Sequence, residues 1–183
     1  MKSLKHLVLS DKDKRLRQKV EKLNVNHISS QDQEKIDAMM EYIDACYNDK
    51  EEEYGIRAGI ALDGPQVGLM KQVVYIHFQE NDVEHKYLLA NPKIVSHSLV
   101  MACLGAGEGC SSVDEKQKGL VPRYKRIIVE AYDLLNKKPV KIDNETILSL
   151  CLQHEIDHLN GILYYDHINK KDPDFKKPDW IIY

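Results

Sequence analysis

The chain has 183 residues, 43% of them hydrophobic and 30% charged, which fits one globular domain with a sizeable core. Its 26 lysines and arginines nearly balance its 29 aspartates and glutamates, giving a formal net charge of −3, so no basic footprint for nucleic acid or anionic lipid is present. The sequence contains neither a long apolar run typical of a membrane span nor the pattern of a cleaved signal peptide, and we expect a cytoplasmic protein.

The first clear element is an amphipathic helix that follows a mixed, charged arm over residues 1–28. Ser30 and Gln33 have the spacing of a capping box, and the helix is expected to end near Tyr47. Apolar side chains then recur at helical spacing and are expected to pack in the core: Ile36, Met39, Met40, Ile43 and Tyr47. The charged run 48–53 is expected to be a solvated loop.

Short strands follow, separated by turn residues. The expected strands cover residues 73–78, 87–90, 93–96, 126–134 and 139–142. Because the connections are too brief for helical crossovers, we expect mostly antiparallel pairing. The tail over residues 169–183 is expected to be extended, with a possible edge strand at 180–183.

The last clear element is a helix that the sequence predicts to be buried. Asp143 or Asn144 can cap it and Gly161 can close it. Apolar residues lie around nearly its whole circumference: Ile147, Leu148, Leu150, Cys151, Leu152, Ile156 and Leu159. Polar side chains on such a helix need partners, because unpaired buried charge is costly.

That helix carries the motif H-E-x-x-H at residues 154–158. Residues four apart share one helix face, so His154 and His158 can approach one metal ion while Glu155 lies beside it as a base. The alternative is two core histidines satisfied by hydrogen bonds.

The third ligand decides the class of such a site. Tyr164 occupies the position of the third metzincin histidine, and no glutamate follows the motif to serve a peptidase. Downstream candidates are Asp166 and His167. The upstream candidate is Cys110, whose small neighbours in residues 107–112 leave its sulfur accessible.

The other three cysteines, Cys46, Cys103 and Cys151, are expected to be buried thiols, since four cysteines are too few for a disulfide scaffold.

Three motifs together resemble the peptide deformylase family. They cover residues 59–66, 108–112 and 153–161, and the last matches Q-H-E-x-D-H-L-x-G at every fixed position. The segment 121–123 is also similar to the family. The resemblance extends from about residue 30 to the end. The insertion before the first motif and the short apolar C-terminus resemble the longer subtype of Gram-positive bacteria and mycoplasmas.

The resemblance implies roles for individual residues. Cys110, His154 and His158 would bind the metal, leaving a fourth place for water. Glu155 would move the proton, and the Gln66 amide and the Ser111 backbone N–H would donate to the formyl oxygen. With Ser111, the remaining implied residues bind substrate. The backbone of Ile60 and Ala61 would pair with the peptide, and Arg123 would lie near the peptide's exit. The pocket for the methionine side chain would be formed by Ile147, Leu150 and Cys151.

The resemblance also implies a cofactor and a substrate. One divalent ion is expected, with Fe(II) as the native metal and Zn(II) or another divalent ion as alternatives. The substrate would be the N-formylmethionyl end of nascent peptides, acted on by a monomer, and transient contact with the ribosome stays open. The competing hypotheses are a metallopeptidase that uses the same helix and a non-catalytic metal-binding protein.

The chain departs from the family at two places. The first family motif reads G-x-G-x-A-A-x-Q, but Ala61, Asp63 and Gly64 replace its second glycine and both alanines. Ser111 stands where leucine is usual. We expect Asp63 to disturb the loop that carries Gln66, and Ser111 to alter mainly the pocket wall.

The predicted fold is a single α+β catalytic domain over residues 1–183. Short antiparallel strands would wrap around the buried helix that carries H-E-x-x-H, with the amphipathic helix outside. Residues 1–28 would form an N-terminal arm and residues 169–183 a C-terminal tail.

Overall fold

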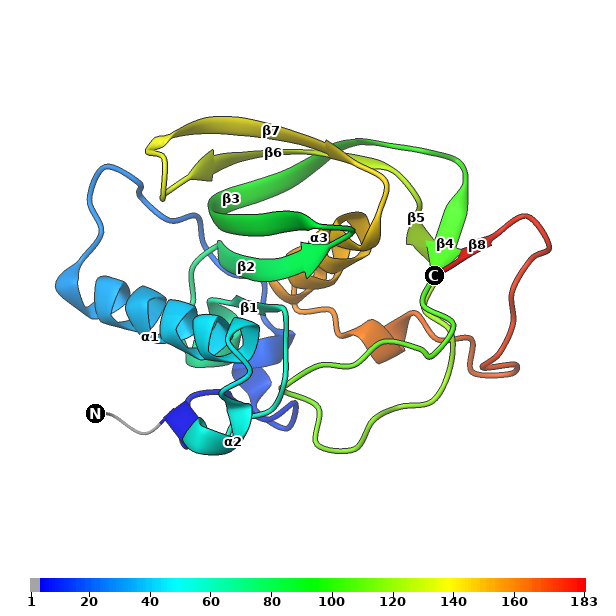
Figure 1. Cartoon of the computed structure of the whole chain (residues 1–183), viewed down its shortest axis with the longest axis horizontal. Helices are drawn as coiled ribbons and strands as arrows, with labels where there is room; N and C mark the ends of the chain where they lie inside the picture. The colour runs from blue at the N-terminus through cyan, green and yellow to red at the C-terminus, as the bar shows by residue number, and fades with distance from the viewer. Residues whose placement is uncertain (1–3) are drawn as a thin grey trace.

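The computed structural model describes residues 4–183 and has the expected mixed α+β architecture (Figure 1). The α-helices are α1 (Ser30–Tyr47), α2 (Glu51–Tyr54) and α3 (Ile147–His158). The strands are β1 (Ala61–Asp63), β2 (Val73–Glu80), β3 (Val83–His97), β4 (Met101–Cys103), β5 (Arg123–Tyr124), β6 (Ile127–Asp133), β7 (Lys138–Asn144) and β8 (Ile181–Ile182). Short 3₁₀ turns are η1 (Leu4–His6), η2 (Lys14–Arg17), η3 (Pro65–Val67) and η4 (Tyr164–Asp166).

The strands form two sheets. The larger has the order β1-β2-β3-β6-β7 and is antiparallel throughout, which confirms the expected pairing. The smaller has the order β5-β4-β8, in which β4 and β8 run parallel. Within the larger sheet β1 is an edge strand, so one side of its backbone is not paired within the sheet.

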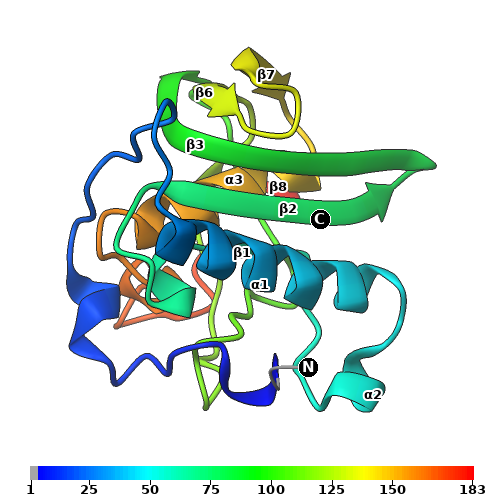
Figure 2. The ribbon, with the colours of Figure 1, turned by 90° about the vertical axis from the view of Figure 1, so that its left-hand side faces the viewer.

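The larger sheet lies between α1 and α3 (Figures 1 and 2). Successive side chains of a strand point to opposite faces, and β2 alternates accordingly. Val73 and Tyr75 pack in the cluster that includes α1, whereas Val74 and Ile76 pack in the cluster that includes α3. Burial on both faces explains why residues 73–78 read as an unbroken apolar run.

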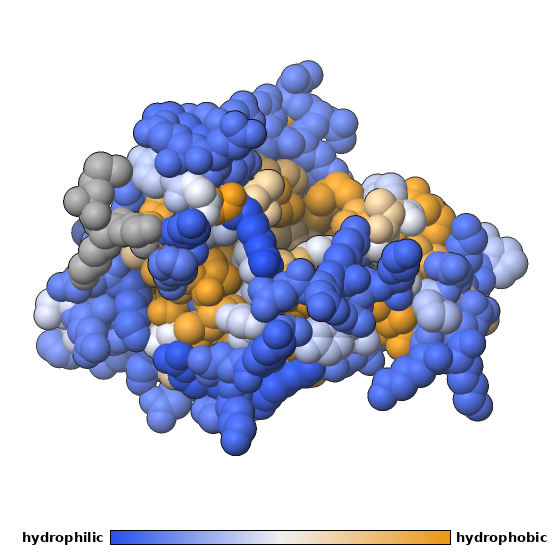
Figure 3. All heavy atoms as spheres, turned by 90° about the horizontal axis from the view of Figure 1, so that it is seen from below, coloured by the Kyte–Doolittle hydropathy of each residue, from blue (hydrophilic) through white to orange (hydrophobic). Residues whose placement is uncertain are grey.

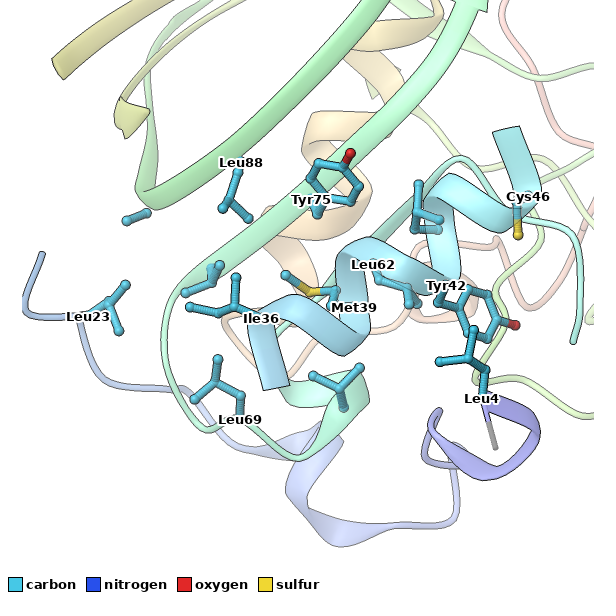
Figure 4. Packing of buried hydrophobic residues seen from close by; sticks show 14 residues of the cluster. Leu4, Leu23, Ile36, Met39, Tyr42, Cys46, Leu62, Leu69, Tyr75 and Leu88 are labelled. Atoms are coloured by element: carbon cyan, nitrogen blue, oxygen red, sulfur yellow. The ribbon is translucent and has the colours of Figure 1, made fainter. Parts of the chain in front are cut away.

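Helix α1 ends at Tyr47 as predicted, but the cap position was wrong by one residue. Ser29 is the N-cap, and its hydroxyl accepts a hydrogen bond from the Asp32 N–H. Ile36 and Met39 pack against Tyr75 and the neighbouring strand (Figure 4). The predicted loop at 48–53 is also partly wrong, because residues 51–54 form the one-turn helix α2, which ends at left-handed Gly55.

Strand β3 joins two segments that the sequence separates. Asn91 has a positive φ of 55°, and the register with β6 shifts between Ala90 and Lys93. A proline follows Asn91 and lacks the N–H that a regular ladder needs. The irregularity therefore interrupts the sequence pattern without ending the strand.

Helix α3 is buried, as its apolar circumference predicts. Its N-cap is Thr146, so the expectation of Asp143 or Asn144 was wrong; both belong to β7. After the helix, Gly161 adopts a φ of 76° beside the backbone of Arg17. The N-terminal segment is fastened there, since the Val20 N–H donates to the Leu159 carbonyl at 3.0 Å.

The tail confirms the predicted edge strand, since β8 pairs with Ala102 and Cys103 of β4. Among the described residues, no helix has the length and apolar character needed to cross a membrane.

Close packing of the backbone explains why glycine occupies position 64, one of the departures from the family motif. A Cβ at this position would lie 2.6 Å from the carbonyl oxygens of both Leu69 and Lys71. We expect Gly64→Ala to lower the free energy of unfolding by about 1–3 kcal/mol, because backbone must move to admit the methyl group. Urea denaturation measures the change. Gly109→Ala is the control, since nothing lies within 4 Å of its added Cβ; equal stability of the two variants would contradict the prediction.

Candidate active site

Three separate segments surround one cavity of about 440 Å³. They are residues 57–61, which lead into β1, with Gln66 from the turn after that strand; the loop before and around Cys110; and one face of α3. The cavity is lined by Arg57, Ala58, Gly59, Ile60, Ala61, Gln66, Leu104, Glu108, Gly109, Cys110, Ser111, Ile147, Leu150, Cys151, His154 and Glu155. Figure 3, which views the molecule from below, shows apolar side chains gathered in a hollow between polar surroundings.

A thiol and two imidazoles meet at this cavity. The Cys110 Sγ lies 3.7 Å from the His158 Nε2, and ligand atoms of Cys110, His154 and His158 all lie within 4.8 Å of one another. The two histidines are neighbours on α3, with ring centroids 4.7 Å apart. These residues could hold a metal ion, as the sequence predicts.

Each histidine is oriented by a carboxylate from a distant segment. The His154 Nδ1 lies 2.7 Å from the Glu108 Oε2, and the His158 Nδ1 lies 2.5 Å from the Asp63 Oδ2. A carboxylate accepts the Nδ1 proton and leaves Nε2 as the atom available to a metal, an arrangement that metal-ligating histidines commonly show. The surroundings therefore fit a divalent ion bound by two imidazoles and a thiolate.

The charges at the site favour the thiolate. Burial raises the pKa of Cys110, but His158 and His154 outweigh it and bring this pKa to about 6. Burial lowers the pKa of His154, yet hydrogen bonding to Cys110 and Glu108 raises it to about 9. Thiol and imidazoles thus stabilise each other's charged forms, as the donors of a metal site do before an ion is bound.

Glu155 lies beside these groups and is 5% exposed. Its Oε2 is the one buried side-chain N or O atom in the described part of the chain without a hydrogen-bond partner. Burial raises the pKa of its carboxyl group to about 8. Unpaired buried oxygens are rare in folded proteins, so this atom is a candidate for contact with a ligand, water or substrate.

Gln66 is held with its amide toward the same place. Its Nε2 donates to the hydroxyls of Ser111 and Ser112, at 3.2 and 3.1 Å, and lies 3.5 Å from the Cys110 Sγ. Its Oε1 accepts the Asp63 N–H at 3.1 Å. The amide is therefore fixed in one orientation, with its N–H groups toward Cys110 and the two serines.

Asp63 does not disturb this loop, contrary to expectation. Its Oδ1 accepts the backbone N–H of Gln66 at 3.0 Å while its Oδ2 meets His158. The carboxylate closes the turn between β1 and η3, and so stabilises the segment it was expected to disorder.

Most predicted substrate-binding residues line the cavity. Ile60 and Ala61 come from the segment that leads into β1, Ser111 from the Cys110 loop, and Ile147, Leu150 and Cys151 from α3. Arg57 and Leu104 also line it, although no sequence motif pointed to them. Arg57 is fastened there because its guanidinium donates to the carbonyls of Ser111 and Val113 and to Asp114.

Arg123 differs from the expectation that it lies at the peptide's exit. It is 3% exposed and does not line the cavity. Its Nε and Nη2 donate to the two Glu108 oxygens at 2.8 and 2.9 Å, and its Nη1 pairs with Asp157. Arg123 therefore holds the carboxylate that orients His154. The resemblance of residues 121–123 to the family pointed to Arg123, but it did not indicate that Glu108 is the partner of this side chain.

The downstream candidates for a third ligand are engaged elsewhere. Asp166 pairs with Arg17 and accepts the Leu163 N–H, and His167 lies 2.7 Å from Asp157. Neither belongs to the residue groups that could hold a metal in the described part of the chain.

An apolar cavity that combines a thiol, two oriented imidazoles and an unpartnered buried carboxylate defines a hydrolase-type site able to hold a divalent ion. The family model of polypeptide deformylases matches residues 5–174. The chain belongs to the polypeptide deformylase family, whose members are enzymes that remove the N-formyl group from nascent peptides.

Individual relatives agree. The peptide deformylase of Ureaplasma parvum is 42% identical over 165 residues, which covers 90% of this chain and 83% of the relative. That of Listeria monocytogenes is 44% identical over 143 residues, covering 77% of this chain and 78% of the relative. The crystal structure of the Ehrlichia chaffeensis peptide deformylase in complex with actinonin matches with a TM-score of 0.71 at 28% identity, covering 90% of this chain and 88% of that one.

The buried pair of Arg123 and Glu108 leads to a stability prediction. Arg123→Ala leaves the Glu108 carboxylate buried without its cation, and we expect a loss of about 3–5 kcal/mol in the free energy of unfolding. Urea denaturation measures it. Arg126→Ala is the control, because Arg126 pairs with Asp143 on the exposed surface and its loss should change stability little. A similarly small loss for Arg123→Ala would show that the buried pair is not stabilising the site.

Proposed function

We propose that this chain acts on N-formylmethionyl peptides at the cavity described above, with Cys110, His154 and His158 as ligands of one divalent ion. The observation that supports this most directly is the convergence of the Cys110 Sγ with the two imidazoles beside the unpartnered Glu155. Each further role below is inferred from the position of a side chain in that cavity.

The proposed ligand set is a thiolate and two neutral imidazoles. When bound, a divalent ion supplies Lewis acidity, which polarises a carbonyl and makes water a nucleophile at neutral pH. Soft thiolate and imidazole donors suit iron and zinc, and we propose Fe(II) as the native ion.

Glu155 is the proposed proton carrier. Its Oε2 has no partner among the described residues and Glu155 lines the cavity, so its ionised form, which a nearby bound cation would favour, can accept a proton from the attacking water and deliver it to the departing amine.

The developing charge on the formyl oxygen needs donors. The Gln66 amide is oriented toward Cys110 by Asp63 and the two serines, and we infer that it donates to this oxygen together with the Ser111 backbone N–H. Both N–H groups of this amide are engaged with serine hydroxyls, so one of these hydrogen bonds would be exchanged for one to the formyl oxygen.

The peptide backbone has a ready partner in β1. This strand is an edge of the larger sheet. Its first residue, Ala61, and the preceding Ile60 both line the cavity. We infer that the substrate adds alongside as an extra strand, with hydrogen bonds to the backbone of these residues. Ile147, Leu150 and Cys151 of α3 would then contact the methionine side chain.

One copy of the chain supplies every residue of this site, so we propose that it works as a monomer. We further propose that it meets its substrates in the cytoplasm. The near balance of charge offers no basic surface excess for ribosomal RNA, which favours at most a transient contact with the ribosome.

Formate release tests the proposed reaction. Protein purified anaerobically and loaded with Fe(II) should release formate from formyl-Met-Ala and leave an unformylated Met-Ala-Ser tripeptide intact. Cleavage of the tripeptide would instead indicate a metallopeptidase, and no reaction with either would leave only a metal-binding role.

The roles of Glu155 and Cys110 can be separated. Glu155→Gln should keep the bound metal but lower kcat for formate release by about 10²- to 10⁴-fold, because the proton carrier is lost. Cys110→Ser should lose the metal as well. Metal analysis and the formate assay measure both, with Cys46→Ser as the control thiol, which lies outside the cavity lining. Full metal content in Cys110→Ser would contradict the proposed ligand set.

Gln66 is expected to act on the transition state. Gln66→Ala should lower kcat about 10²- to 10³-fold with little change in KM, because it removes a donor needed only as charge develops. Gln33→Ala, on the exposed side of α1, is the control. An effect confined to KM would assign Gln66 to ground-state binding.

A further inference from the structure

Asp63 is the residue of the cavity region whose chemistry the proposed function leaves unused. It is fully buried, with 0% of its surface exposed. In the described part of the chain no lysine or arginine forms an ion pair with it, and the His158 imidazole is its one ion-pair partner. A buried carboxylate is costly unless its oxygens are satisfied, so its contacts show what it does.

The two carboxylate oxygens of Asp63 have different partners. Oδ2 lies 2.5 Å from the His158 Nδ1, and Oδ1 accepts the Gln66 backbone N–H at 3.0 Å. The Asp63 N–H in turn donates to the Gln66 side-chain oxygen at 3.1 Å. One residue therefore touches both a proposed metal ligand and the proposed oxyanion donor.

Glu108 offers a useful contrast. It also meets a histidine Nδ1, but Arg123 balances its charge through two further hydrogen bonds. No lysine or arginine among the described residues does this for Asp63, whose Oδ2 meets His158 directly and whose charge also acts on the nearby Glu155. An imidazole that donates Nδ1–H to an unneutralised carboxylate is a stronger donor through Nε2, and its ring is fixed in one orientation.

We propose that Asp63 is a positioning residue that couples the two halves of the site. Through Oδ2 it fixes the ring of His158 with Nε2 toward Cys110, and through Oδ1 and its N–H it fixes Gln66. This inference rests on the proposed function, since it assumes that His158 binds the ion. The alanine typical of the family at this position could supply only the backbone part of these contacts.

Two variants separate the two contacts. Asp63→Ala removes both side-chain hydrogen bonds. Asp63→Asn has one oxygen and one NH₂ group, so it can accept the His158 Nδ1–H but then faces the Gln66 N–H with a donor. Asn therefore restores the contact with the metal ligand and leaves the contact with Gln66 broken.

Cobalt(II) binding gives a readout that does not depend on activity. Titration of the metal-free proteins, followed by visible absorption of the cobalt–thiolate site, measures affinity and ligand geometry. We expect Asp63→Ala to bind Co(II) about 10- to 100-fold more weakly with an altered spectrum, and Asp63→Asn to recover most of the affinity and the parent spectrum. In the Co(II)-loaded proteins, kcat for formate release should stay at least about tenfold low in Asp63→Asn, because Gln66 is loosened.

Asp133→Ala is the matched control for loss of a buried aspartate. Asp133 is 3% exposed and accepts hydrogen bonds in the turn after β6, outside the cavity lining. It should lower stability to urea but leave Co(II) affinity and spectrum unchanged.

Equal Co(II) affinity and spectrum in the parent and Asp63→Ala would overturn the inference. If Asp63→Ala does not fold, Asp63→Asn decides: unchanged affinity, spectrum and kcat would overturn it, whereas a lowered kcat with the parent spectrum would support it. A parent protein that shows no cobalt–thiolate absorption would instead overturn the proposed metal site, and this inference with it.

Discussion

The constraint on which this structure depends is the burial of polar side chains within α3. His154 and His158 lie on a helix packed on most sides by apolar groups, where unpaired imidazoles would be costly. The solution is a carboxylate for each ring, from Glu108 in one case and Asp63 in the other. Those carboxylates come from segments far apart in the chain. The hydrogen bonds that they make to His154 and His158 therefore also bring the walls of the cavity together.

The larger sheet makes that arrangement possible. Strand β2 is buried on both faces, so α1 and α3 can pack on opposite sides of the same strands. Strand β1 remains at the edge, next to the face of α3 that carries the polar residues. The fold thus places an edge strand and the cluster of Cys110, His154 and His158 beside one cavity.

The polar network has a directional order. Arg123 neutralises Glu108, and Glu108 orients His154 through Nδ1, which leaves Nε2 of that ring to face Cys110. On the other side no lysine or arginine of residues 4–183 pairs with Asp63, which contacts both His158 and the Gln66 backbone. Glu155 is the third buried carboxylate near the two histidines, with one oxygen unpartnered among the described residues. An energetically costly atom is retained where proton transfer is proposed, as is common at functional sites.

Patterns local in sequence determined much of this protein. Helical periodicity predicted α1 and α3 within a few residues, and the spacing of His154 and His158 required that they share one face. The cap positions were wrong, because Ser29 rather than its neighbour Ser30 caps α1, and the first N–H of α3 donates to Glu80 of β2, a partner remote in the chain. The irregularity at Asn91 likewise hid a single strand, because pairing with β6 continues across it.

Tertiary structure alone decided the rest. The family motifs gave Arg123 and Asp63 as positions, but only the fold shows that one is buried against Glu108 and the other bonded to His158. Charge pairing of this kind depends on distances between segments that are remote in the chain, and sequence periodicity carries no information about them. The sequence by itself determined which chemical groups helix α3 carries. The packing of the chain decided which side chains form hydrogen bonds with those groups and orient them.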